Sequence, residues 1–363
     1  MLTLIVPGLL WPRQALVDLT GDLVDPHHPA LPAFTALLGR GRIARAAGGS
    51  THDWLARLLG LPAPLSAAAL RGLAMGDISR DDNDNVNTSA SAAGQRWLCL
   101  DPLHLRLDQL RAIVDPPQLT DLRMAEAEPL AVSLAPTFSA FGELRVLAPH
   151  AWQLRLHPGV DAPPTMPLPD LIARAAPTLP DGATWAAWRR ALTEAQMILH
   201  AHPVNQAREA AGQPAINSLW PWGAGALPTP TMPTAQTALP TPAGDTLLWS
   251  ADSLAQGAAR LLGLATAPAP AHYTPPSTAA ALMLFDDLDY PARSADTHTW
   301  RERLLALEND WLAPALAALR RGQIAELRLL APGETLSFDI RLRRADDWKF
   351  WRRPAPLTSI ALP

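Results

Sequence analysis

The sequence predicts an α/β protein with a mainly parallel sheet flanked by helices, into which a small α+β domain is inserted. In the first and last parts of the chain, short apolar runs alternate with stretches of helical periodicity, a pattern typical of parallel sheets. In the middle, short strand-like runs surround one long helical stretch, which indicates a separate α+β domain. The length of 363 residues leaves room for both parts.

The domain boundaries follow from the same pattern. We expect residues 1–75 and 195–363 to build the α/β core, and residues 96–194 to form the inserted α+β domain with a proline-rich connector at 158–180. Residues 80–95, RDDNDNVNTSASAAGQ, are polar and almost free of large apolar side chains, so they are predicted to form a mobile loop.

Several elements of the core have clear boundaries in the sequence. The apolar run 2–6 is closed by Pro7-Gly8 and predicts a central strand that enters a turn. The small-residue stretch GGSTHD predicts a turn in which Ser50 or Thr51 caps the following helix. A serine at such a place is most often a cap, but it is also where a nucleophile benefits from the helix dipole, so Ser50 is the candidate nucleophile. The other helices expected in the core are 31–39, 53–60, 253–263 and 299–319, the last kinked or divided at Pro314, and the other strands are 246–250, 280–285, 324–330 and 336–343.

The stretch 194–225 has the highest density of candidate functional side chains in the sequence. We expect a helix from about residue 184 to end before Pro203, Asn205 to cap a second helix at 206–211, and a buried strand at 216–220. Two interpretations stay open: the polar side chains satisfy backbone groups at a buried junction, or they line a ligand site. Asn217 fits the first and Arg208 the second, because a guanidinium is suited to an anion. The candidate binding residues are His200, His202, Asn205, Arg208 and Asn217.

Composition excludes several classes of function. The net charge of -4 argues against a nucleic-acid partner. The single cysteine, Cys99, excludes an intramolecular disulfide, and we expect it to be a small buried hydrophobe in a reducing compartment. The apolar start lacks a basic region, and no apolar run reaches the roughly 18 residues that a membrane span needs. We therefore expect a soluble, cytoplasmic protein without a membrane partner.

Three stretches carry a resemblance to known proteins. The main one is His202-Pro203-Val204-Asn205, Arg208, Gly212, Pro214, Asn217 and Trp220-Pro221-Trp222-Gly223, and the others are SLAQGAARLLGL after Asp252 and the turn at Ser50. Together with the order of elements, they resemble the cofactor-independent phosphoglycerate mutases of the archaeal type, in the alkaline-phosphatase superfamily. The main stretch resembles more closely a proteobacterial group of phosphoglycerate-mutase-like regulatory proteins. The resemblance implies an alkaline-phosphatase-like core built from both ends of the chain.

Mutases of this kind transfer a phosphoryl group through a phosphoserine or phosphothreonine and two divalent metals. The family's serine falls on Ser50, but its metal ligands are missing. Pro7 stands at the first aspartate, with Leu10 and Trp11 at the places beyond Gly8. The later strand offers FDDLDYP without the expected histidine, and the stretch 329–337, LLAPGETLS, lacks the family's aspartate-histidine pair.

We therefore expect a catalytically degenerate phosphoglycerate-mutase-like protein that acts in regulation or by binding a ligand or partner. The resemblance implies a phosphorylated small molecule or a regulatory protein as that partner, and no cofactor. The alternative is a metal-dependent phosphoglycerate mutase or related phosphatase that uses manganese or zinc. In that case Asp286, Asp287 and Asp289 are the candidate ligands, although the pattern favours a solvated acidic loop over a cation site, because carboxylates in loops are usually exposed.

Overall fold

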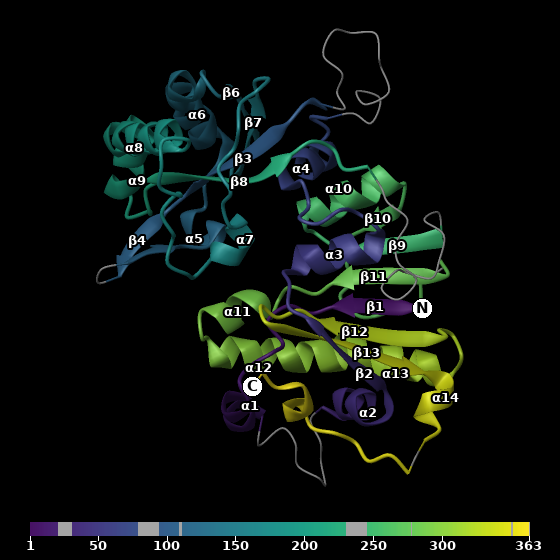
Figure 1. The fold of residues 1–363 in the computed structure, drawn as a ribbon. Coiled ribbons are helices and arrows are strands. Elements are labelled where there is room, and N and C mark those ends of the chain that lie inside the picture. Colours follow the sequence, from purple (N-terminus) through teal and green to yellow (C-terminus); the bar gives the residue numbers. More distant parts are fainter. Residues whose placement is uncertain are drawn as a thin grey trace. The chain divides into compact units, whose positions relative to one another are not determined.

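The computed structural model describes residues 1–20, 31–78, 94–108, 111–229, 245–276, 278–349 and 351–362. The chain divides into two compact units (Figure 1). The core unit comprises residues 1–63 and 231–363, and the insert unit comprises residues 64–230. No helix of the described ranges has the length and apolar character that crossing a membrane requires.

The core unit is built on a seven-stranded sheet with the order β10-β9-β11-β1-β12-β13-β2. The strand β1 lies at its centre and pairs in parallel with both β11 and β12, while β13 is antiparallel to its two neighbours. The sheet is therefore mainly parallel, and the predicted α/β class is confirmed. Its strands are β1 (Leu2–Ile5), β2 (Arg42–Ala47), β9 (Thr246–Trp249), β10 (Ala265–Ala267), β11 (Ala280–Leu284), β12 (Glu326–Ala331) and β13 (Leu336–Arg343).

Helices cover both faces of this sheet. On one face, residues of α2, α12 and α13 share a hydrophobic core with Leu4, Leu329 and Phe338. On the other face lies α3, because Trp54 donates its indole N–H to the side chain of Ser337, which alternates with Phe338 along β13. The helical elements of the core unit are α1 (Arg13–Thr20), α2 (Pro32–Arg40), α3 (Thr51–Leu59), α10 (Ser253–Leu262), α11 (Asp289–Arg293), α12 (Thr297–Ala306), η4 (Leu307–Leu312), α13 (Ala313–Arg320), α14 (Arg344–Asp347) and η5 (Leu357–Ile360).

The long helix expected at 299–319 forms in three parts, α12, the π-helical turn η4 and α13. Pro314 falls at the start of α13 instead of kinking a continuous α-helix. Within η4, the buried carboxylate of Glu308 accepts hydrogen bonds from the backbone N–H groups of Ala33 (2.6 Å) and Phe34 (2.9 Å). These N–H groups open α2, so Glu308 caps that helix from a distant part of the chain.

The insert unit contains a four-stranded antiparallel sheet with the order β6-β7-β3-β8 and a two-stranded β4-β5 ribbon. Helices α6 and α8 contribute Phe138 and Trp188 to its own hydrophobic core. The elements of this unit are α4 (Ala67–Met75), β3 (Trp97–Leu103), β4 (Leu105–Asp108), β5 (Arg111–Val114), α5 (Pro117–Thr120), α6 (Met124–Phe138), β6 (Gly142–Ala148), β7 (Ala151–Leu156), α7 (Leu168–Leu171), α8 (Ala186–Ala201), α9 (Pro203–Ala210) and β8 (Ser218–Gly225).

The structure corrects the expected domain boundaries. The stretch 195–230 was expected in the core, but it belongs to the insert unit because β8 pairs antiparallel with β3. Residues 64–75 also belong to the insert unit, since α4 packs against β3 and β8. Most of the loop expected at 80–95 lies outside the described residues; at its end, the Gln95 side chain donates to the Leu156 carbonyl at 2.9 Å.

Two local expectations were also wrong. The second helix of the central stretch begins at Pro203, and its cap is His202, whose Nδ1 accepts from the N–H of Val204 at 3.2 Å. Asn205 was the expected cap, but it lies inside the helix because proline suits a first helical position. Gly212, just after the end of this helix, is in the left-handed region with a φ of 72°.

Candidate functional site

The topology of the core unit brings the expected catalytic segments to one edge of the sheet. Strands β1, β9 and β11 are parallel, and β2 runs in the same direction because it is antiparallel to β13, which is antiparallel to β12. The residues that follow these strands, Pro7, Ser50, Asp252 and Asp286, therefore lie at the carboxyl edge. Open α/β sheets bind their ligands at this edge.

Ser50 occupies the N-cap of α3. Its hydroxyl oxygen accepts a hydrogen bond from the N–H of Asp53 at 3.1 Å, and the Asp53 carboxylate accepts one from the N–H of Ser50 at 2.9 Å. This reciprocal pair is a capping box and confirms the expected cap. Such a cap keeps the hydroxyl at the positive end of the helix dipole. A role for Ser50 as nucleophile stays a prediction.

His52, the second residue of α3, forms an ion pair with Asp252 at the start of α10. The Nε2 of His52 lies 3.3 Å from Oδ2 of Asp252, and Oδ1 accepts from the N–H of Ala255 at 2.7 Å. Burial acts to raise the pKa of Asp252. The charge of His52 and hydrogen bonds from that side chain and from the backbone outweigh burial and hold the pKa below its usual range. Both oxygens of Asp252 are therefore engaged, and the pair links α3 to α10.

The three aspartates after β11 are not equivalent. Desolvation raises the pKa of Asp286, and the neighbouring charges of Asp287, Asp252 and Asp289 raise it further. Asp289 instead forms an ion pair with Arg293 one turn along α11, with Nε of the arginine 3.0 Å from Oδ1 and Nη2 donating to Oδ2. In the described contacts, Asp286 and Asp287 therefore form no ion pair with an arginine, unlike Asp289.

These donors do not fit a centre of two divalent metals. Both oxygens of Asp252 and both of Asp289 already accept hydrogen bonds, as described above. The turn after β1 is apolar: Trp11 packs edge-to-face on Trp300, which also donates its indole N–H to the carbonyl of Gly8 at 2.8 Å. Within the described ranges, no three side chains of His, Cys, Asp or Glu come together in a way that could hold a metal ion.

The asparagines of the central stretch bind backbone groups of the insert unit. Asn205, 1% exposed, donates to the carbonyls of Leu199 and Ile216, both at 2.7 Å, and accepts from the N–H of Ile216 at 2.8 Å. Asn217 accepts from the N–H of Leu105 at 2.7 Å and donates to its carbonyl at 2.9 Å. Asn205 thereby joins α8, α9 and the segment before β8, and Asn217 fixes the start of β4.

The expectation that Arg208 faces a cleft was wrong. The residue is 1% exposed, and its guanidinium donates to the Pro214 carbonyl at 3.0 Å, to a carboxylate oxygen of Glu126 at 2.8 Å and to the Thr120 carbonyl. A buried guanidinium needs such partners in place of water. These contacts hold α9 against α6 and the end of α5.

The two histidines of the central stretch do not join these residues in one open site. His200 is exposed on α8, and His202 caps α9. Burial lowers the pKa of His202. A ligand-binding role for the five candidates stays a prediction, whereas the contacts of Asn205, Arg208 and Asn217 describe a buried junction.

We expect Asn217→Ala to lower the free energy of unfolding by about 1 to 3 kcal/mol, because it strands the N–H and carbonyl of Leu105. Chemical denaturation measures the change. Gln206→Ala, on the exposed side of α9, is the matched control and should change stability by less than about 0.5 kcal/mol. Equal stabilities for the two variants would contradict the junction role of Asn217.

A buried polar cluster of the insert unit was not anticipated. Asp101, 2% exposed, accepts hydrogen bonds from Nη1 of Arg71 (2.7 Å), from the indole N–H of Trp222 (2.7 Å) and from the backbone N–H of Trp152 (2.9 Å). Arg71 also donates to the Trp152 carbonyl and lies over the Trp222 ring. The signal in the sequence was a charge inside the apolar run WLCLDPL, where an ionised side chain requires a buried partner. Beside this pair, burial raises the pKa of the Cys99 thiol, and Cys99 is the buried hydrophobe expected.

Comparison with known proteins gives a fold and no family. No protein-family model matches the chain, and no curated protein matches its sequence. Among solved structures, a cofactor-independent phosphoglycerate mutase from Thermoplasma acidophilum DSM 1728 is similar, with 14% identity, a TM-score of 0.41 and coverage of 99% of this chain and 94% of that chain. The PH0037 protein from Pyrococcus horikoshii also has 14% identity, with a TM-score of 0.53 and coverage of 98% and 91%. The likeness to PH0037 shows that almost the whole chain, core and insert, adopts a fold already seen in a solved structure.

Proposed function

We propose that this protein is a catalytically degenerate phosphoglycerate-mutase-like protein that binds a phosphorylated small molecule at the carboxyl edge of the core sheet. In this role it acts in regulation, by ligand or partner binding, and not by turnover. The observation that carries the proposal is that acidic side chains at this edge are already occupied by ion pairs and hydrogen bonds within the protein. Asp252 is paired with His52 and caps α10, and Asp289 is paired with Arg293.

The same pairs explain why metal-dependent phosphoryl transfer is disfavoured. Two metals need several free carboxylate and imidazole donors to neutralise the phosphate. Recruiting Asp252 or Asp289 would require breaking an ion pair and would leave His52 or Arg293 without its partner.

A phosphate can instead be recognised by this chain's own groups. The N-terminus of α3 presents the positive end of a helix dipole, and Ser50 supplies a hydroxyl group there. His52 adds a positive charge when it is protonated, in the first turn of the same helix. This combination binds an anion without a metal.

We expect 3-phosphoglycerate or inorganic phosphate to raise the melting temperature of the protein at pH 6. His52→Gln should weaken that binding by about tenfold or more, since hydrogen bonds to charged groups contribute about 1.5 to 3 kcal/mol. Isothermal titration of the full chain measures the affinity. His298→Gln is the matched control, because His298 also pairs with a carboxylate, that of Glu302 at 3.3 Å, but is exposed on α12.

Two results would contradict the proposal. One is that the parent protein binds neither 3-phosphoglycerate nor phosphate. The other is that His52→Gln and His298→Gln bind these anions equally well. Each result would remove the carboxyl edge as the anion site.

The second candidate is a metal-dependent phosphoglycerate mutase or phosphatase that uses manganese or zinc. One feature favours it: burial, and after it the charges of three neighbouring aspartates, raise the pKa of Asp286, and a cation would relieve the repulsion between these carboxylates. Elemental analysis of purified protein and a mutase assay with added manganese or zinc test this candidate. Two equivalents of tightly bound metal, with turnover that Asp286→Asn and Ser50→Ala abolish, would replace the binding proposal.

A further inference from the structure

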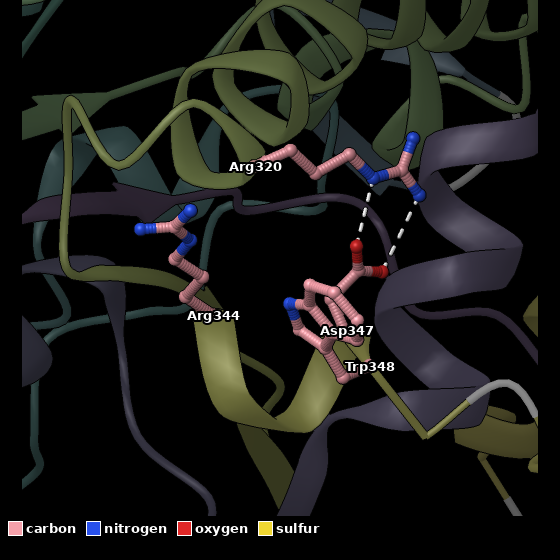
Figure 2. A pocket seen from close by; sticks show the side chains of 4 residues that line it. All are labelled: Arg320, Arg344, Asp347 and Trp348. Carbon is pink, nitrogen blue, oxygen red and sulfur yellow. Dashed lines mark hydrogen bonds and ion pairs between the residues drawn. The ribbon is translucent and has the colours of Figure 1, made fainter.

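A pocket lies at the opposite edge of the core sheet from Ser50. Because β13 is antiparallel to the parallel strands, its last residue and the helix α14 that follows lie at their amino edge. Here a pocket of about 320 Å³ is lined by Arg320, Arg344, Asp347 and Trp348 (Figure 2). This volume is at the lower end of the range for small-molecule sites.

The pocket has more positive than negative charge. Asp347 accepts hydrogen bonds from Nε and Nη2 of Arg320, at 2.8 and 3.3 Å, and from Nη1 of Arg40 at 2.8 Å. Burial opposes ionisation of Asp347, but these hydrogen bonds outweigh it and lower its pKa below the usual range. One carboxylate thus remains charged, but it is shared between two guanidinium groups.

Arg344 adds a third positive charge on the other side of the pocket (Figure 2). Among the described residues, no carboxylate forms an ion pair with it. Its Nη1 lies beside Gly322, where a Cβ would stand 2.9 Å from that nitrogen. Gly322 follows the end of α13, and a helix C-terminus favours cations by about 0.3 to 1 kcal/mol. That attraction accounts for an arginine at this position. Among the described contacts, however, no group accepts a hydrogen bond from the five N–H donors of the Arg344 guanidinium.

Trp348 supplies a flat apolar wall. The residue is 72% exposed, although tryptophan usually buries its large ring. Figure 2 shows the indole between the Arg320–Asp347 pair and the side of Arg344. An exposed indole beside an arginine with which no described carboxylate pairs can stack on an aromatic ring while that arginine binds an attached anion.

We propose that this pocket binds a small anion that carries a flat aromatic ring, of the class of a nucleoside monophosphate. The phosphate is held by Arg344 and Arg320, and the base stacks on Trp348. The site is separate from the carboxyl edge and does not depend on the function proposed there.

Isothermal titration of the full chain with AMP, adenosine and inorganic phosphate tests the proposal. AMP should bind at least tenfold more tightly than either fragment, because only AMP offers both the ring and the charge. Arg344→Gln should weaken AMP binding at least tenfold. Trp348→Leu should weaken AMP binding and leave phosphate binding unchanged. Both side chains are exposed, so circular dichroism of the variants should match that of the parent.

Two control variants separate a built site from general attraction. Arg321→Gln removes the same charge one residue from Arg320, outside the pocket lining, and Trp351→Leu removes another exposed indole, 68% exposed, near Trp348. Both should leave AMP binding unchanged. The proposal is overturned if AMP binds no more tightly than phosphate, if Trp348→Leu has no effect, or if Arg321→Gln weakens binding as much as Arg344→Gln.

Discussion

Asp101→Ala is expected to lower the free energy of unfolding of the insert unit by about 3 to 5 kcal/mol, the cost of breaking a buried ion pair by removing one partner. The substitution leaves the guanidinium of Arg71 buried without its carboxylate and strands the indole N–H of Trp222 and the backbone N–H of Trp152. Chemical denaturation gives the overall change. Hydrogen exchange at the amides of β3 and β8 locates it in the insert unit.

The matched control is Asp161→Ala, which removes an exposed ion pair with Arg96 (3.4 Å) from the same unit. It should change stability by less than about 1 kcal/mol. Replacing Arg71 as well, in Asp101→Ala/Arg71→Met, should restore part of the loss because no charge is then left unpaired. A loss for Asp101→Ala as small as that of Asp161→Ala would show that the cluster does not stabilise the unit.

Asp339→Asn should destabilise the core unit by about 3 kcal/mol at pH 7. Arg328 is 1% exposed, and its Nε and Nη2 donate to the two oxygens of Asp339 at 2.9 Å each. Arg341 donates to the same carboxylate at 2.7 Å. An amide keeps the shape but removes the negative charge to which both guanidinium groups, one of them buried, donate.

The pH dependence of this prediction has a definite sign. Burial acts to raise the pKa of Asp339, but the hydrogen bonds and charges of Arg328 and Arg341 outweigh it, so the folded pKa lies below the ordinary 3.8. The stabilisation by Asp339 is therefore complete above about pH 4 and is lost as the pH falls through the folded pKa. Urea unfolding from pH 7 to pH 2 should show the parent and Asp339→Asn converging at the acid end. The exposed Asp18→Asn should follow the parent throughout, and a gap that widens in acid would contradict the assignment.

The core elements were predictable where one local signal was sufficient. The run 2–6 is apolar on both faces because β1 is covered by helices on both sides, and such runs are typical of central parallel strands. Ser50 and Asp252 precede helical periodicity and do cap α3 and α10. Both residues lie at the carboxyl edge of the sheet because the strands that precede them, β2 and β9, run in the same direction.

Other features depend on partners that are distant in the sequence. The strand β2, RIARAA, shows no alternation because side chains on both of its faces are exposed at the edge of the sheet. The strand β3 extends through Asp101-Pro102, although proline is disfavoured inside a sheet. Its pairs with β7 end at Cys99, so the missing N–H of Pro102 removes no hydrogen bond on that side.

The candidate site was predicted less well than the fold. Arg208 was expected to face a cleft because its chemistry suits an anion, but its acceptors come from Pro214, Glu126 and Thr120. Two of these lie more than 80 residues away in the sequence. The position of a polar side chain within a helix does not tell whether such distant acceptors will surround it. His52, which pairs with Asp252 200 residues away, was missed for the same reason.

The central place of β1 sets an order of events during synthesis. Ile5 pairs with Leu284 on one side and with Leu330 on the other. At a translation rate of about 5 to 20 residues per second, the first strand waits roughly 15 to 65 s after leaving the ribosome before both partners exist. The contiguous insert unit can close during this interval, while the apolar segment LTLI remains without strands to pair with. The nascent chain therefore carries an exposed apolar segment at residues 2–5 until residue 330 has been made, and chaperones that bind such segments can act on it throughout that interval.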